Sequence, residues 1–197
     1  ALVMAVNRHA VACRSPSEPG HSPRLGDRSA IHAPAEASPH RSPSLRPEVM
    51  EVARRLGAEV PCLDVSALEH ENRKLGLGGS AAATVAAAGL LLAEQGLDLA
   101  EPAARARVLE IALDAHWAVQ PRGSGTDVVA STLGGVSIVT RPQGEHLQCT
   151  RPHAERTELP PGLVVEAWAF PLSVRTSDLL DRLAEIRAQD VGPRREH

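Results

Sequence analysis

The stretch GLGGSAAATVAAAGLLLAE, residues 76–94, constrains the fold more than any other part of the chain. Three glycines fall within four residues, and a serine and a run of small aliphatic residues follow them. The glycines predict a tight turn, and the run predicts a helix from about Ser80 to Gln95 that stops at Gly96. Such a turn lets a helix pack closely on its neighbours or lets a ligand approach backbone N–H groups.

Composition excludes several classes of partner. Only 2% of the residues are aromatic, and the net charge is −3 with basic and acidic residues interspersed. A nucleic-acid surface built on base stacking or on a basic patch is therefore not expected. The longest apolar run, residues 81–93, is too short to span a bilayer. We expect no nucleic-acid partner and no membrane span.

Three cysteines, Cys13, Cys62 and Cys149, lie far apart in the sequence. An odd and unclustered set is typical of a reducing compartment rather than of a disulfide scaffold or a zinc site. The start of the chain has no basic region and no small-residue cleavage pattern, so it is a poor signal peptide. A cytoplasmic location is predicted. Because the chain begins in the middle of a sequence pattern, we also expect a fragment of a larger protein.

The remaining patterns predict a mixture of helices and strands, and hence an α+β fold rather than a succession of parallel βαβ units. We expect strands over residues 1–12, 61–68 and 162–170, and a β-hairpin over 136–150 that turns at 142–145. We expect helices over residues 47–59, 102–120 and 176–189. Residues 15–47 are rich in proline and serine and predict a long exposed loop or a disordered insertion, and residues 151–156 predict a surface turn.

The first glycine turn has the chemistry of a phosphate cradle. A helix N-terminus offers unpaired N–H groups and the positive end of the helix dipole, and glycines leave that backbone open to an anion. Ser80 stands where the helix begins and could cap it or face a phosphate oxygen or a Mg²⁺ ion, and Lys74 could add a positive charge. The order of residues fits neither the Walker A motif nor the dinucleotide fingerprint, and a simple packing turn stays an alternative.

A second glycine-rich turn, GSGTDVVASTLGG over residues 123–135, carries one carboxylate, Asp127. That carboxylate could accept a proton from a substrate hydroxyl or balance a nearby lysine. Taken alone, Asp127 is better explained as the N-cap of the helix that DVVAS predicts. The helix before this turn carries His116 and Trp117, which we interpret as packing residues.

Together the two turns resemble motifs of the GHMP kinases. GLGGSAA resembles the Gly-Leu-Gly-Ser-Ser-Ala loop of that family, and GSGTDVVASTLGG resembles the Ser-Gly-x-Asp loop of its mevalonate and phosphomevalonate branches. ALVMAVNRHAVA resembles the strand after the family's first motif, and SVRTSDLL resembles a Ser-x-Ser-Thr segment of phosphomevalonate kinases. The four segments come in family order and extend over most of the chain outside the proline-rich insertion.

The resemblance implies a fold, a reaction and two cofactors. The fold would be the α+β N-terminal domain of the ribosomal-protein-S5 domain-2 type, over residues 1–14 and 48–197, without the ferredoxin-like C-terminal domain. The reaction would be phosphoryl transfer from ATP, with Mg²⁺, to a small molecule, phosphomevalonate first and mevalonate second. A homodimer is conceivable.

The resemblance also implies roles for particular residues. Asp127 and Lys74 would be catalytic, and Ser80 would help to hold Mg²⁺. The nucleotide would contact Gly76, Leu77, Gly78, Gly79, Ser80 and Ala81. The acceptor would contact Arg122, Ser124, Gly125, Ser173 and Thr176. Arg122 could instead be a solvated loop cation, and Ser173 and Thr176 could simply cap a helix.

Two departures from the family pattern matter. Gly79 stands where the family has the first serine of its loop, which removes a hydroxyl but keeps the N–H donor. The family's first motif and its third glycine-rich motif are not in this sequence. We therefore expect a partial kinase, and a non-catalytic relic that still binds nucleotide is the alternative. A second alternative is an α+β domain that serves only protein interaction.

Overall fold

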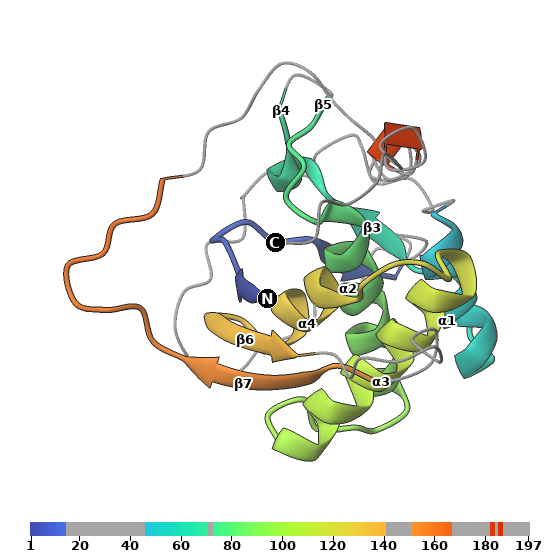
Figure 1. Ribbon diagram of the computed structural model, residues 1–197. Helices are drawn as coiled ribbons and strands as arrows, with labels where there is room; N and C mark the ends of the chain where they lie inside the picture. Colours follow the sequence, from blue (N-terminus) through green and yellow to red (C-terminus); the bar gives the residue numbers. More distant parts are fainter. Residues whose placement is uncertain (15–45, 71–72, 141–150, 167–181, 184, 187–197) are drawn as a thin grey trace.

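The computed structural model describes residues 1–14, 46–70, 73–140, 151–166, 182–183 and 185–186. Helices and antiparallel sheets alternate irregularly along these residues, which confirms the α+β class (Figure 1). The α-helices are α1 (Pro47–Leu56), α2 (Gly79–Glu94), α3 (Pro102–Val119) and α4 (Thr126–Leu133). None of the described helices is long and apolar enough to cross a membrane.

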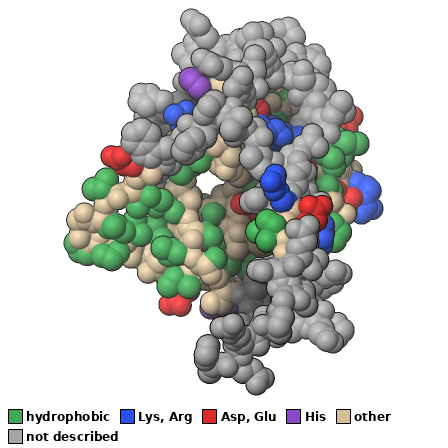
Figure 2. Space-filling view, turned by 45° about the horizontal axis from the view of Figure 1, so that its top comes forward, with side chains coloured by type: hydrophobic (Ala, Val, Ile, Leu, Met, Phe, Trp, Pro, Cys, Tyr) green, Lys and Arg blue, Asp and Glu red, His purple; other side chains and the backbone are tan. Residues whose placement is uncertain are grey.

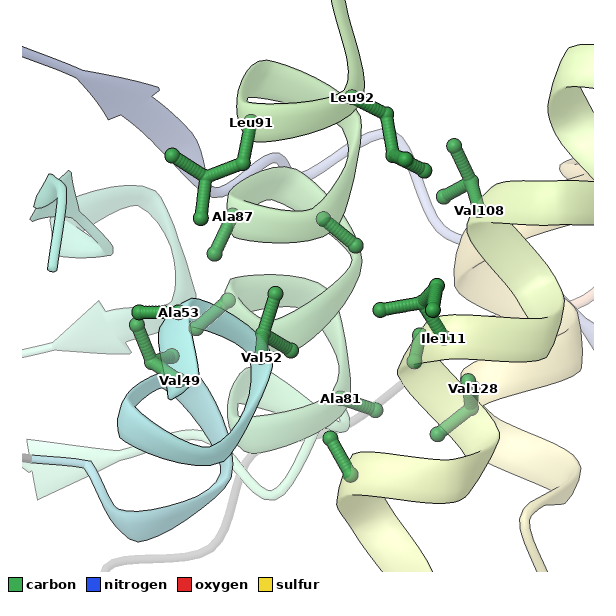
Figure 3. Packing of buried hydrophobic residues seen from close by; sticks show 14 of the residues in the cluster. Val49, Val52, Ala53, Ala81, Ala87, Leu91, Leu92, Val108, Ile111 and Val128 are labelled. Atoms are coloured by element: carbon green, nitrogen blue, oxygen red, sulfur yellow. The ribbon is translucent and has the colours of Figure 1, made fainter. Parts of the chain in front are cut away.

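The core lies between the helices (Figure 3). α1 packs on α2 and α3, and α2 also packs on α4. The side chains that fill this space are aliphatic, among them Val49 and Val52 from α1, Leu91 from α2 and Ile111 from α3. Because α2 presents alanines on most of its buried positions, the neighbouring helices approach it closely. The aliphatic core that the composition predicts is therefore present.

Three small antiparallel sheets surround the helices (Figure 1). The largest has the order β1-β6-β7 and joins β1 (Leu2–Met4), β6 (Val136–Thr140) and β7 (His153–Thr157). A second sheet pairs β2 (Val11–Cys13) with β3 (Cys62–Asp64). The 3-10 helix η1 (Ser66–Leu68) follows β3 and leads into the hairpin of β4 (Glu69–His70) and β5 (Arg73–Lys74).

The helices predicted over residues 47–59, 80–95 and 102–120 are present, with small changes at their ends. α1 ends at Leu56 rather than near residue 59, because Gly57 takes the left-handed conformation at φ 60° and its N–H bonds back to the last turn. α2 and α3 match the predicted ranges to within a residue or two. Apolar periodicity and the Pro and Gly signals were enough to place these elements.

The single strand predicted over residues 1–12 is wrong. Residues 2–4 and 11–13 form two strands in two different sheets, and the chain turns between them. The turn is tight, since the Arg8 N–H donates to the Val6 carbonyl at 2.8 Å. The three polar residues of this turn, Asn7, Arg8 and His9, are exposed.

Two further predictions need correction. The surface turn predicted over residues 151–156 is wrong, because residues 153–157 form β7 and pair with β6. Of the hairpin predicted over 136–150, the first strand is confirmed as β6, but the strand that it pairs with is β7 at residues 153–157, and residues 141–150 lie outside the described residues. Residues 162–166 are not in a strand.

Several predicted segments fall wholly or partly outside the described residues. They are the insertion over 15–45, the end of the strand at 167–170 and most of the helix over 176–189. Residues 182–183 and 185–186 of that last segment are helical. The cysteines are not all far apart, because Cys13 and Cys62 are directly opposite one another in the β2–β3 pair.

Charged side chains are mixed over the surface. On the face seen in Figure 2, the described basic and acidic side chains lie interspersed. Many of them form ion pairs, such as Arg55 with Asp114, which joins α1 to α3. Pairs of this exposed kind are worth less than about 1 kcal/mol each, so the packed helices hold the fold together.

Candidate functional site

The first glycine loop leaves its backbone open. Gly76 and Gly78 both have positive φ, 74° and 70°, and Gly78 is the N-cap of α2. A Cβ added at Gly76 would meet no atom within 4 Å, and one at Gly79 would make only ordinary contact with Leu68 at 3.8 Å. Packing therefore does not require glycine at either position. The loop exposes the start of α2, whose N–H groups suit an anion.

The second loop leads into α4 in a different way. Gly125, at φ 72°, is the N-cap of α4, so the prediction that Asp127 is the N-cap is wrong. Asp127 lies in the first turn of α4, where its carboxylate is close to the positive end of the helix dipole. Its side chain is exposed, and Oδ1 accepts from the Val128 N–H at 3.1 Å. Ser124 bonds Thr126 through their hydroxyls at 2.8 Å.

The second loop is pressed against α3. A Cβ at Gly123 would lie 2.3 Å from His116 Nε2, and one at Gly125 would lie 2.7 Å from Leu113 Cδ2. Trp117 Nε1 donates to the Gly123 carbonyl at 3.1 Å. His116 is buried, which agrees with the packing role expected for it and for Trp117. The glycines of this loop are needed so that α4 can start against α3.

The two loops meet at one cavity. A Cβ at Gly78 would lie 3.5 Å from the Cβ of Asp127, so the start of α2 faces the start of α4. Around this contact lies a cavity of about 530 Å³. Its polar and glycine lining comes from three segments: Gly76 and Gly78 of the first loop, Thr126, Asp127 and Ser131 of α4, and Arg8 and His9 of the β1–β2 turn.

Apolar side chains form most of the rest of the wall, and the segment around β1 supplies several of them: Val3, Met4, Ala5, Val6 and Ala10. α2 contributes Ala82, Val85 and Ala86, and α4 contributes Ala130. The opposite side of α2 is buried in the core through Ala83 and Ala87. The alanine-rich sequence thus serves two surfaces, because alanine allows close helix packing on one side and leaves room for a ligand on the other. The volume lies in the range of small-molecule sites.

Some of the predicted nucleotide-loop residues lie away from this cavity. Lys74 is exposed on β5 and lines a smaller hollow of about 60 Å³ together with Gly76 and Gly79. Ser80 is half-buried in the first turn of α2, and its carbonyl accepts from Thr84 Oγ1 at 2.8 Å. Ala81 is 1% exposed and belongs to the core, so a ligand could reach only its backbone.

The predicted acceptor residues are dispersed. Arg122 is exposed in the turn after α3 and is not among the described residues that line the cavity. Ser124 is exposed beside Thr126, and Gly125 is buried against Leu113. Ser173 and Thr176 lie outside the described residues. The structure therefore brings Asp127 together with Gly76, Leu77 and Gly78, but not with Arg122 or Lys74.

Sequence reasoning missed Arg8 and His9. It treated residues 1–12 as one strand and gave no role to the side chains inside it. A signal was available, because Asn7, Arg8 and His9 form a polar triplet that interrupts an apolar run. Such an interruption indicates a turn rather than a continuous strand.

The described residues offer few ligands to a metal. No group of three or more His, Cys, Asp and Glu side chains converges within the described part of the chain. An ion at this cavity would draw on the Asp127 carboxylate and on nearby hydroxyls such as that of Thr126. Magnesium suits that donor set, since it is often held by one or two carboxylates and completed by phosphate oxygens and water.

Two comparisons with known proteins bear on this site. Residues 47–135 match the family model described as the GHMP kinases N terminal domain. A region of 82 residues is 39% identical to a protein named phosphomevalonate kinase from Streptomyces sp. (strain CL190). The matched region is 40% of this chain and 21% of that protein, so the similarity spans about a fifth of the relative.

Proposed function

We propose that this chain, in which residues 47–135 form a GHMP kinase N-terminal domain, binds ATP and a small-molecule acceptor for phosphoryl transfer. The first candidate for the acceptor is phosphomevalonate, and mevalonate is the second. The named relative supports this order, since it is called a phosphomevalonate kinase. The fold would be of the ribosomal-protein-S5 domain-2 type, and the protein would work in the cytoplasm.

One observation carries the proposal. The start of α2 and the first turn of α4, which carries Asp127, lie against one another at Gly78, and both line a cavity large enough for a small molecule. Phosphoryl transfer requires mainly that phosphate, acceptor and charge be positioned together. A helix N-terminus that binds phosphate beside a carboxylate that receives or orients a hydroxyl meets this requirement.

The first loop would hold the phosphates. Gly76 and Gly78 leave the backbone free of Cβ atoms, so the N–H groups at the start of α2 could approach the phosphate oxygens. Ser80 begins the same helix and could offer its hydroxyl to the ion after a rotation about χ1. Magnesium, when bound, would neutralise charge on the transferring phosphoryl group.

Asp127 would act on the acceptor. With a hydroxyl acceptor such as mevalonate, the carboxylate would accept the hydroxyl proton while the oxygen attacks the γ-phosphorus of ATP and the bond from that phosphorus to ADP breaks, releasing ADP. With a phosphate acceptor the attacking oxygen is already ionised, so the carboxylate would only orient it. Loss of the carboxylate should therefore reduce turnover of mevalonate more than turnover of phosphomevalonate.

Binding and turnover test the proposal together. Isothermal titration of the protein with Mg-ATP should show saturable binding, and ADP release should depend on phosphomevalonate or mevalonate. Asp127→Asn should lower turnover of a hydroxyl acceptor about 100-fold or more, because general-base catalysis contributes that much. Absence of Mg-ATP binding in a folded sample would refute the proposal.

A matched control separates chemistry from stability. Asp98 is also an exposed carboxylate whose Oδ1 accepts a nearby backbone N–H, from Ala100 at 2.9 Å, but it is not among the residues that line the cavity. Asp98→Asn should leave turnover unchanged. Equal turnover by the two variants would remove Asp127 from the mechanism, whereas Mg-ATP binding without turnover of either acceptor would favour the nucleotide-binding relic.

A further inference from the structure

The cavity contains a cation, Arg8, that pairs with no carboxylate of the described residues. Arg8 lines the cavity, and its Nη1 donates to the Ala67 carbonyl at 3.3 Å. Among the described residues, no carboxylate lies within ion-pair distance of Arg8. Many other described arginines pair with a carboxylate, namely Arg14, Arg46, Arg54, Arg55, Arg107 and Arg151. The guanidinium of Arg8 therefore has donors left over for a ligand.

The backbone under Arg8 is fixed. Ala5 N–H donates to the Gly135 carbonyl at 2.8 Å, and Arg8 N–H donates to the Val6 carbonyl at 2.8 Å. These bonds join the β1–β2 turn to the end of α4 and close the turn on itself. The bond from Nη1 to Ala67 ties the side chain to η1. An arginine held in this way loses less freedom when it binds an anion than a side chain on a loose loop does.

Arg8 comes from a different segment than the phosphate loop. The first loop already offers N–H groups to phosphate, and Asp127 is in contact with that loop through Gly78. The β1–β2 turn supplies a separate part of the wall, where His9 accompanies Arg8. A molecule that reacts near Asp127 can extend toward this second part, since the cavity holds about 530 Å³.

We propose that Arg8 binds an oxyanion of the phosphoryl acceptor, a carboxylate or a phosphate, and so selects acidic acceptors. The inference rests on the proposed kinase function, and it adds Arg8 to Arg122 as a cation for the acceptor. The guanidinium fork matches either oxyanion through two parallel N–H···O bonds. His9 can add a further donor from the same turn.

Titrations of variants test the role of Arg8. Isothermal titration with phosphomevalonate, with mevalonate and with Mg-ATP is carried out on the wild type, Arg8→Gln and Arg8→Lys. Arg8→Gln should weaken binding of at least one acid by about tenfold to 100-fold, as loss of a charge-assisted bond implies. Arg8→Lys should recover part of that loss, and Mg-ATP binding should be unchanged. Weakened binding of both acids indicates recognition of the carboxylate that they share, and weakened binding of phosphomevalonate alone indicates recognition of its phosphate.

The control and the contrary outcomes are specific. Arg105 is exposed on α3 and is not among the lining residues, so Arg105→Gln should bind every ligand as the wild type does. Because Arg8 is exposed, Arg8→Gln should keep the wild-type melting temperature. If its melting temperature falls, Arg8→Lys is compared with the wild type instead. Unchanged binding of both acids, or weakened binding of Mg-ATP, overturns the inference. A wild type that binds neither acid also overturns the inference. The titration of the wild type with Mg-ATP tests the proposed kinase function separately.

Discussion

The two glycine loops look alike in sequence and differ in what their glycines do. In the first loop, a Cβ at Gly76 or Gly79 would find open space or ordinary contact. In the second, a Cβ at Gly123 or Gly125 would collide with His116 or Leu113 of α3. Glycine therefore keeps the first loop open to a ligand and lets the second loop pack against a helix. On the first-loop side of the cavity the backbone is accessible, and on the second-loop side it is packed against α3.

This difference suits the role proposed for Asp127, whose carboxylate is on the second loop. A residue that orients an acceptor must stay in place, and the second loop is held by the Trp117 bond and by packing on Leu113. A loop that receives phosphates needs exposed N–H groups more than it needs packing. The two loops meet where Gly78 lies against Asp127.

The largest effect should come from a methyl group added to the packed loop. Gly125→Ala combines a positive φ with a Cβ placed 2.7 Å from Leu113 Cδ2, and should lower the free energy of unfolding by about 2–4 kcal/mol. Gly76→Ala has a similar φ but open space, and should cost about 1–2 kcal/mol. Urea denaturation of both variants measures the difference. Equal losses would mean that the second loop is not packed as described.

A substitution in α1, outside both loops, should lower the stability of the two loops equally. The guanidinium of Arg54, helped by that of Arg55, lowers the pKa of the Glu51 carboxyl to about 2. The resulting stabilisation is complete above the ordinary glutamate pKa near 4.5 and disappears as the pH falls toward 2. Glu51→Gln should cost about 0.5–1 kcal/mol at pH 7 and nothing near pH 2.

Because α1 packs on α2, which follows the first loop, and on α3, which precedes the second, this loss should be global. Denaturation of Glu51→Gln and the wild type across this pH range measures it, and hydrogen exchange at pH 7 locates it. A loss of protection confined to one loop would contradict the packing of α1 on both α2 and α3.

The smallest effect on stability should come from Gly79→Ser in the open loop. Gly79 has no positive φ, and its Cβ would make ordinary contact with Leu68, so the free energy of unfolding should change by less than about 0.5 kcal/mol. The added hydroxyl restores the serine of the resembled family beside the start of α2. Mg-ATP affinity should rise severalfold, measured by isothermal titration. A large loss of stability instead would show that Gly79 serves packing.

The helices and the site loops were predictable to different degrees. Apolar periodicity with Pro102 and Gly57 placed α1, α2 and α3, because these signals are local. The motifs pointed correctly to two loops, but they could not tell that Arg122 and Lys74 fall away from the cavity that Asp127 lines. They also missed Arg8, whose position depends on a turn between two strands of different sheets.

The sequence by itself determined the α+β class, the helices, the two glycine-rich turns and the family that they resemble. These features follow from backbone preferences and apolar spacing within short segments. The tertiary structure alone decided which glycines leave space and which ones pack, because that depends on how side chains of α3 and η1 lie against the two loops. It also decided that Arg8, more than a hundred residues from Asp127 in sequence, shares one cavity with that carboxylate.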